Sequence, residues 1–401
     1  MNLTLRRLVQ LILLQCFIYS FLTEWITAYI ENTNINFYLE FLILAFLFLP
    51  LSTLLLLKKT NVKYLIQINN VIPFAIIFLV LPFLHVSILL KYEIFSRRIG
   101  TENIALAYGD MNSIDKFIMK IYDLSQFIFL ISSFYILKAS TKFNGRYFLR
   151  LVFFINLIYL LIFTAFNGRS TFLILIITLL VTDGLFLSIS NRTRKLFLTL
   201  SFVIFLIVSI IRYMPLIIIN SGMSDTNDIV KNEILFRVNC SKLFNEVYEK
   251  SKQKGLLLGK TMINPLLSLQ AMLGDEESKE KIRNAETGSK QYILSEYLQK
   301  SNKDDCSCVV VDSYVNFGFP GIFLLLIIYI TWIIIMLQFF RRKILQSYHF
   351  CFILTIISSL ILYEVDGLSL IFGIIKFLPV FLLFFILNPF RLIKVKIGEQ
   401  E

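Results

Sequence analysis

Residues 318–340 read GFPGIFLLLIIYITWIIIMLQFF and hold no charged side chain, and the basic run Arg341-Arg342-Lys343 follows directly. A helix needs roughly 20 mostly apolar residues to cross the hydrocarbon core of a bilayer. This stretch therefore predicts a membrane-spanning helix that ends at a basic cluster. The whole chain fits the same environment, because 57% of its 401 residues are hydrophobic and 16% are charged, against about 25% charged residues in soluble domains.

Other stretches along the chain have a similar composition, so we expect an all-α polytopic membrane protein with about ten spans. The first apolar run is longer than a signal-peptide core and has no small-residue cleavage pattern, which favours a retained helix. The span at 117–138 is the weakest, because polar residues interrupt its first half. The ten predicted spans cover residues 8–30, 37–57, 71–90, 117–138, 149–167, 170–190, 196–219, 318–340, 348–365 and 368–388.

Basic residues cluster between every second pair of these spans. Cytoplasmic segments of membrane proteins are enriched in Lys and Arg, so the pattern predicts that both termini face the cytoplasm. It also accounts for the net charge of +12 without nucleic-acid binding, because the charges form no continuous stripe. The expected cytoplasmic clusters contain Arg6, Arg7; Lys58, Lys59, Lys63; Lys138, Lys142, Arg146, Arg150; Arg192, Arg194, Lys195; Arg341, Arg342, Lys343; and Arg391, Lys394, Lys396.

This topology divides the chain into three parts. Residues 1–219 hold helices one to seven, residues 220–317 form one long polar loop on the outer side, and residues 318–401 hold helices eight to ten and a cytoplasmic tail. A loop of roughly a hundred residues far exceeds ordinary connections and is typical of a functional segment.

The loop has the composition of a small folded unit. Residues 229–251 and 290–300 carry apolar side chains at helical spacing, and Gly255 to Thr261 reads as a turn. Its cysteines lack the spacing of a metal site, so we expect no metal and no cofactor. Pairing of Cys240 with Cys306 or Cys308 and free thiols both stay open.

Ionisable residues inside the spans are informative, since each costs on the order of 2.5–3.5 kcal/mol on insertion scales. Most lie towards the outer ends of their helices, and Asp183, nearer the cytoplasmic side, is the main exception. This one-sided distribution favours a site served from outside over a transport path through the bundle. The outer set is Glu24, Lys120, Asp123, Arg169 and Arg212, and Lys376 lies near the middle of the last span.

Structural roles for these residues remain open. Arg212 could snorkel to the outer interface, and Arg169 could bond the carbonyls of its turn. Lys120 and Asp123, three residues apart on one helix, could neutralise each other. Lys376 could pair with an acidic neighbour, and we expect structural or interfacial roles for His85 and His349.

Three motifs carry a family resemblance. Residues 312–321, DSYVNFGFPG, resemble the acidic-x-Tyr-x-Asn-Phe-Gly-x-x-Gly signature of the oligosaccharide repeat-unit polymerases (Wzy-type, O-antigen polymerases). The Gly168-Arg169-Ser170 turn is similar to that family's Gly-Arg-Ser before a central helix, and residues 255–261 look like its glycine-containing loop segment. The resemblance covers residues from about 165 to 340. The family's Pro-Arg-x-x-Trp-Pro-like run is absent at 265–274, so the role of its arginine is not carried over.

The resemblance implies a GT-C-like membrane glycosyltransferase that needs no cofactor. Such enzymes polymerise undecaprenyl-diphosphate-linked repeat units into O-antigen or capsule-like polysaccharide at the outer face of the bacterial cytoplasmic (inner) membrane. The partners that follow are the lipid-linked glycan, membrane lipid, a chain-length regulator and a flippase, with no nucleic acid.

The chemistry assigns roles to particular residues. Cations must stabilise the departing diphosphate, and arginine makes forked bonds to phosphate. A base must accept the proton of the acceptor hydroxyl, for which Asp312 is the candidate as base or acceptor-orienting group, although it could merely cap a helix. The diphosphate candidates are Arg169 and Arg212, then Arg237, Lys260, Arg97 and Arg98; Tyr314 and Asn316 are expected sugar contacts, and Glu364 and Asp366 the alternative base.

Other functions stay open beside this one. A lipid-linked oligosaccharide flippase or transporter would need polar groups along an alternating path, which the distribution of charges does not favour. An O-antigen-type ligase would be expected to carry a functional histidine in the outer loop, and residues 220–317 contain none. A non-catalytic assembly partner is the third alternative.

Overall fold

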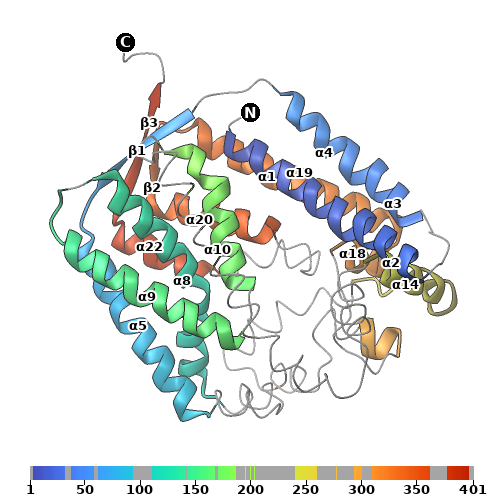
Figure 1. Ribbon diagram of the computed structural model, residues 1–401, viewed down its shortest axis with the longest axis horizontal. Helices are drawn as coiled ribbons and strands as arrows, with labels where there is room; N and C mark the ends of the chain where they lie inside the picture. The colour runs from blue at the N-terminus through green and yellow to red at the C-terminus, as the bar shows by residue number, and fades with distance from the viewer. Residues whose placement is uncertain are drawn as a thin grey trace.

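The computed structural model describes a helical protein in ten segments of the chain. The described residues are 3–31, 38–57, 62–93, 111–140, 142–167, 170–186, 240–259, 293–299, 309–361 and 377–396, with the single positions 195, 199, 203 and 277. Figure 1 displays how these segments are arranged.

The amino-terminal half contains helices that match the predicted spans closely. The first apolar run forms one helix with a π-helical middle, and the second forms a helix of the same kind that ends in a 3₁₀ turn. Their bounds are α1 (Leu3–Cys16), η1 (Phe17–Leu22) and α2 (Thr23–Glu31), then α3 (Tyr38–Ile43), η2 (Leu44–Phe48), α4 (Leu49–Thr53) and η3 (Leu54–Leu56). The next helices are α5 (Ile72–Lys91), α8 (Ser113–Ala139), α9 (Arg146–Asn167), α10 (Ser170–Thr182) and the 3₁₀ turn η4 (Asp183–Leu185).

The loop and the carboxy-terminal part are also mainly helical. Within the predicted loop, α14 (Cys240–Lys254) overlaps the expected helix at 229–251, and the π-helical turn η7 (Ile293–Tyr297) lies within the expected helix at 290–300. The helices that follow are α18 (Val309–Phe317), α19 (Phe319–Arg341), α20 (Ser347–Ile361) and α22 (Leu378–Leu387).

Four helices in the described part of the chain are long and apolar enough to cross a membrane. They are Leu3–Tyr29, Ile72–Lys91, Ser113–Ala139 and Phe319–Arg341, and shorter apolar helices accompany them. The protein therefore has the helices of a membrane protein. The predicted span at 196–219 falls outside the described residues apart from two single positions, and so does the first part of 368–388, so the number of ten spans stays a prediction.

A small antiparallel sheet departs from the all-α expectation. Strands β1 (Val62–Ile68) and β2 (Ile344–Gln346) flank β3 (Phe390–Lys396), and the β1–β3 register runs from Val62 opposite Lys396 to Ile68 opposite Phe390. These segments were expected to be connections and a tail. Strand formation could not be anticipated because the pairing joins opposite ends of the chain, without a local hairpin turn.

The sheet lies at the same end of the helices as the amino terminus of α1 (Figure 1). Tyr64 Oη donates to Phe340 O (3.2 Å), and Lys394 Nζ donates to the same carbonyl (3.1 Å). Arg7 Nη1 lies 3.5 Å from Asp183 Oδ2, so the costly carboxylate near the predicted cytoplasmic side has a cationic partner. The three strands and the amino terminus of α1 were predicted to lie on one side of the membrane. In the structure they lie at one end of the molecule (Figure 1).

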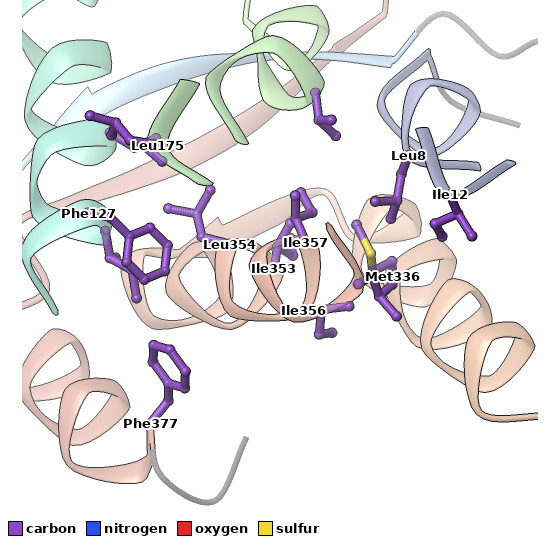
Figure 2. Packing of buried hydrophobic residues seen from close by; sticks show 14 of the residues in the cluster. Leu8, Ile12, Phe127, Leu175, Met336, Ile353, Leu354, Ile356, Ile357 and Phe377 are labelled. Carbon is purple, nitrogen blue, oxygen red and sulfur yellow. The ribbon is translucent and has the colours of Figure 1, made fainter. Parts of the chain in front are cut away.

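The apolar core is built around α20. Its side chains Ile353, Leu354 and Ile357 are fully buried and lie between Leu175 of α10 and Leu8 of α1 (Figure 2). Since α20 is surrounded by helices from both halves of the sequence, this core joins the amino-terminal and carboxy-terminal parts into one body.

Candidate functional site

The described part of the predicted outer loop packs against the start of α19. Helix α14 lies along α18, and it also contacts α2, α3 and η1 (Figure 1). We call the unit formed by α14, residues 255–259, α18 and Gly318–Gly321 the seam. Through α14 the seam is anchored on the ends of the first two hydrophobic helices, opposite the end that carries the sheet.

Residues 255–259 close the carboxy-terminal end of α18. Leu257 N–H donates to Val315 O (2.9 Å) and Leu258 N–H donates to Asn316 O (2.9 Å). Gly259 N–H donates to the side chain of Asn316 at Oδ1 (3.1 Å). The last carbonyls of a helix lack intrahelical partners, so these bonds explain why the glycine segment binds there. Two motifs separated by more than fifty residues in the sequence are thereby joined.

Asn316 also holds Asp312, one helical turn earlier. Asn316 Nδ2 donates to Asp312 O (2.8 Å) and lies 3.3 Å from Asp312 Oδ1. Both residues are buried, with 1% of Asp312 exposed. The N-cap of α19 is Gly318, so Asp312 does not cap that helix. The geometry instead fixes the direction of a buried carboxylate inside the seam.

Tyr314 fills the space between the seam helices. Its ring packs edge-on against Phe244 (centroids 4.8 Å apart) and Phe319 (5.6 Å), and it lies 6.1 Å from the ring of Tyr248. Burial raises the pKa of the Tyr314 hydroxyl above its ordinary value. The phenol therefore stays neutral and can donate a hydrogen bond across the physiological range.

Two lysines of α14, Lys252 and Lys254, bind protein groups. Lys252 Nζ lies 2.8 Å from Glu249 Oε1 and 4.0 Å from the centre of the Tyr248 ring. Lys254 Nζ donates to Tyr297 O (3.2 Å), and Tyr297 Oη donates to Gly255 O (2.7 Å). These contacts tie η7 to the end of α14, which extends the folded unit to the second amphipathic helix.

Most of the expected diphosphate and base candidates fall outside the described residues. Among the residues that the structure does describe, no group of three His, Cys, Asp or Glu side chains could hold a metal ion. Cys240 is buried at the start of α14. The residues outside the description are Arg97, Arg98, Arg169, Arg212, Arg237, Lys260, Cys306, Cys308, Glu364, Asp366 and Lys376.

A second polar cluster was missed by sequence reasoning. His85 of α5 lies between Asp123 of α8 and Tyr159 of α9. The available signal was weak: His85 and Asp123 both interrupt apolar runs near the same predicted side, but tertiary packing decides which helices meet.

Comparisons of the chain with protein-family models, with curated proteins and with solved structures find no match.

Proposed function

We propose that the protein is a membrane glycosyltransferase that polymerises undecaprenyl-diphosphate-linked oligosaccharide repeat units into O-antigen or capsule-like polysaccharide. The observation that carries this proposal is the seam. The glycine segment at 255–259 and the Asp312–Gly321 signature are the two loop motifs that resemble the repeat-unit polymerases, and they bind each other through backbone and side-chain hydrogen bonds. A chance similarity of two short motifs gives no reason for such a contact.

The reaction transfers the growing chain to a new unit. A hydroxyl oxygen of the acceptor unit forms a bond to the anomeric carbon at the reducing end of the chain. The bond from that carbon to the diphosphate oxygen breaks, and its electron pair leaves with undecaprenyl diphosphate. The hydroxyl proton passes to a base. Since the bond that breaks is already activated, no nucleotide or ATP is consumed.

The protein must supply two functions for this reaction. We assign the leaving diphosphate to Arg169 and Arg212, because arginine stays charged when partly buried and binds phosphate in a fork. Asp312, with its direction fixed by Asn316, is suited to orient the acceptor or accept its proton. A GT-C-like arrangement and an active site at the outer face of the inner membrane belong to the same proposal.

The arginine assignment is tested by polymer length. The host that lacks this gene is complemented with the wild type, Arg169→Ala or Arg212→Ala, and its surface polysaccharide is separated on a gel. Loss of one stabilising group at a transition-state charge costs about 10²–10³-fold in rate, so we expect the ladder to shrink to one or a few repeats.

Matched variants separate charge from geometry and from folding. Arg150→Ala makes the same change at an exposed arginine of α9 and should leave the ladder intact. Lysine at 169 or 212 keeps the charge but removes the fork, so we expect partial chain lengths. Unchanged long chains with Arg169→Ala and Arg212→Ala at normal protein levels would refute the assignment.

A further inference from the structure

His85, Asp123 and Tyr159 form a series of polar contacts across three helices, in which His85 is hydrogen-bonded to Tyr159 and lies at ion-pair distance from Asp123. His85 Nδ1 lies 2.5 Å from Tyr159 Oη, and His85 Nε2 lies 3.2 Å from Asp123 Oδ1. The imidazole is fully buried, whereas 43% of the Asp123 side chain is exposed. The carboxylate is therefore the end of the series that a ligand can reach.

The contact with Tyr159 bears on which imidazole nitrogen of His85 can carry a proton. When Tyr159 donates its hydroxyl proton to Nδ1, the neutral imidazole carries its own proton on Nε2, the nitrogen nearest Asp123. Asp123 Oδ1 lies within ion-pair distance of that nitrogen. A carboxylate beside a buried imidazole is an arrangement that enzymes use for acid–base chemistry.

Neutral polar groups beside the cluster already join the same three helices. Asn156 Nδ2 donates to Phe78 O (2.7 Å) and Val152 O (2.9 Å), and its Oδ1 accepts from Tyr122 Oη (3.0 Å). These bonds join α5, α8 and α9 without any ionisable carboxylate or imidazole. Placing His and Asp beside them adds a desolvation cost, and in a membrane helix such groups mark functional sites by default.

The cluster belongs to the end of the helices that is predicted to face outward. Lys91 Nζ and Asp115 Oδ2 lie 2.7 Å apart where α5 ends and α8 begins. Asp123 follows Asp115 by eight residues, which is about 12 Å along the helix. A substrate that enters from that end meets Asp123 before it meets the apolar half of α8.

We propose that Asp123 is the general base of the polymerisation, an assignment that rests on the function proposed above. The acceptor hydroxyl oxygen bonds to the anomeric carbon, the carbon–oxygen bond to the diphosphate breaks with its electron pair, and the hydroxyl proton moves to the Asp123 carboxylate. His85 and Tyr159 are positioning residues that hold this carboxylate. Asp312, buried within the seam, then takes no proton from the acceptor.

Asp123→Asn distinguishes a base from a structural contact. Asparagine keeps an oxygen opposite His85 Nε2, so a structural role would survive, but its amide cannot take up a proton. Chain growth is measured in vesicles from the host membranes, supplied with the host's lipid-linked repeat unit. We expect kcat to fall at least about 100-fold, the usual contribution of a general base, with an unchanged KM.

The control makes the same substitution on the same helix. Asp115→Asn removes the carboxylate charge that pairs with Lys91 and should keep the wild-type kcat. Tyr159→Phe keeps the ring but deletes the hydroxyl, and we expect a smaller fall in kcat at constant KM. If the melting temperature shows that Asp123→Asn is unstable, the proposal is tested with Tyr159→Phe instead. An unchanged kcat of Tyr159→Phe would then overturn it.

The remaining outcomes separate this inference from the proposed function. Wild-type vesicles that polymerise, with Asp123→Asn as active as the wild type, would overturn the role of Asp123 and leave the function standing. Wild-type vesicles that make no polymer from the host's own donor would overturn the function and this assignment with it.

Discussion

At the residue scale, two glycines explain the spacing of the signature before α19. Gly318 adopts a φ of +63° between α18 and α19, a region that side chains with a Cβ disfavour. A Cβ at Gly321 would lie 2.0 Å from Ser313 O, so only glycine lets the two helices approach this closely. The glycines of the signature are thus required for the close approach of α18 and α19, whatever function the protein has.

Gly321→Ala should open this junction. The overlap is with backbone, so no change of rotamer relieves it, and overpacking of this kind costs about 1–3 kcal/mol or more. We expect a lower melting temperature, faster proteolysis of the seam and shorter polysaccharide.

Gly255→Ala is the control for glycine loss in the same seam. Position 255 has open space around a Cβ but a φ of +78°, so its cost is the conformational penalty alone, about 1–2 kcal/mol. Equal melting temperatures for the two variants would contradict the close-approach explanation for Gly321.

At the scale of elements, an ion pair joins α1 to the 3₁₀ turn η4 at the sheet end of the molecule. Arg7 Nη1 donates to Leu180 O (2.8 Å) and lies 3.5 Å from Asp183 Oδ2. The Asp183 side chain is 10% exposed and the Arg7 side chain 28%. Because the Asp183 carboxylate is the less exposed of the two, its charge needs the ion pair more than the charge of Arg7 does.

Removing Arg7 alone should lower the stability of the protein more than removing both Arg7 and Asp183. Arg7→Ala leaves Asp183 in a buried place, and a buried charge without its partner is strongly destabilising. We expect Arg7→Ala to have the lowest melting temperature in detergent, and the Arg7→Ala/Asp183→Ala double variant to regain part of the loss. Additive effects of the two changes would show that the residues are not coupled.

At the scale of the whole molecule, the sheet and the seam mark opposite ends of the bundle. The sheet gathers three segments that the charge pattern assigns to the cytoplasm, and the seam gathers the loop assigned to the outer side. In the predicted ten-span topology an even number of spans separates these three segments, so the pairing agrees with that prediction. The positive-inside rule predicts that the sheet end faces the cytoplasm.

Cysteine labelling in intact cells tests this direction. In a variant without native cysteines, we expect Lys252→Cys in α14 to react with a membrane-impermeant maleimide added outside. Gln67→Cys in β1, an exposed position of the sheet, should react only after the cells are permeabilised. The reverse pattern would invert the topology and place the seam in the cytoplasm.

The sequence by itself determined the helical class, the bounds of most apolar helices and the existence of a folded loop. Membrane helices satisfy their own backbone groups, so a run such as 318–340 forms a helix whatever its neighbours do. The sequence also singled out both motifs that meet in the seam, because glycines at required positions leave a local signal.

Only the tertiary structure decided which distant segments meet. The pairing of Val62–Ile68 with Phe390–Lys396 depends on where the chain ends return. The contact of His85 with Asp123 depends on how α5 packs against α8. No local propensity encodes either contact, since each is formed by residues that reach one another only after the helices have assembled.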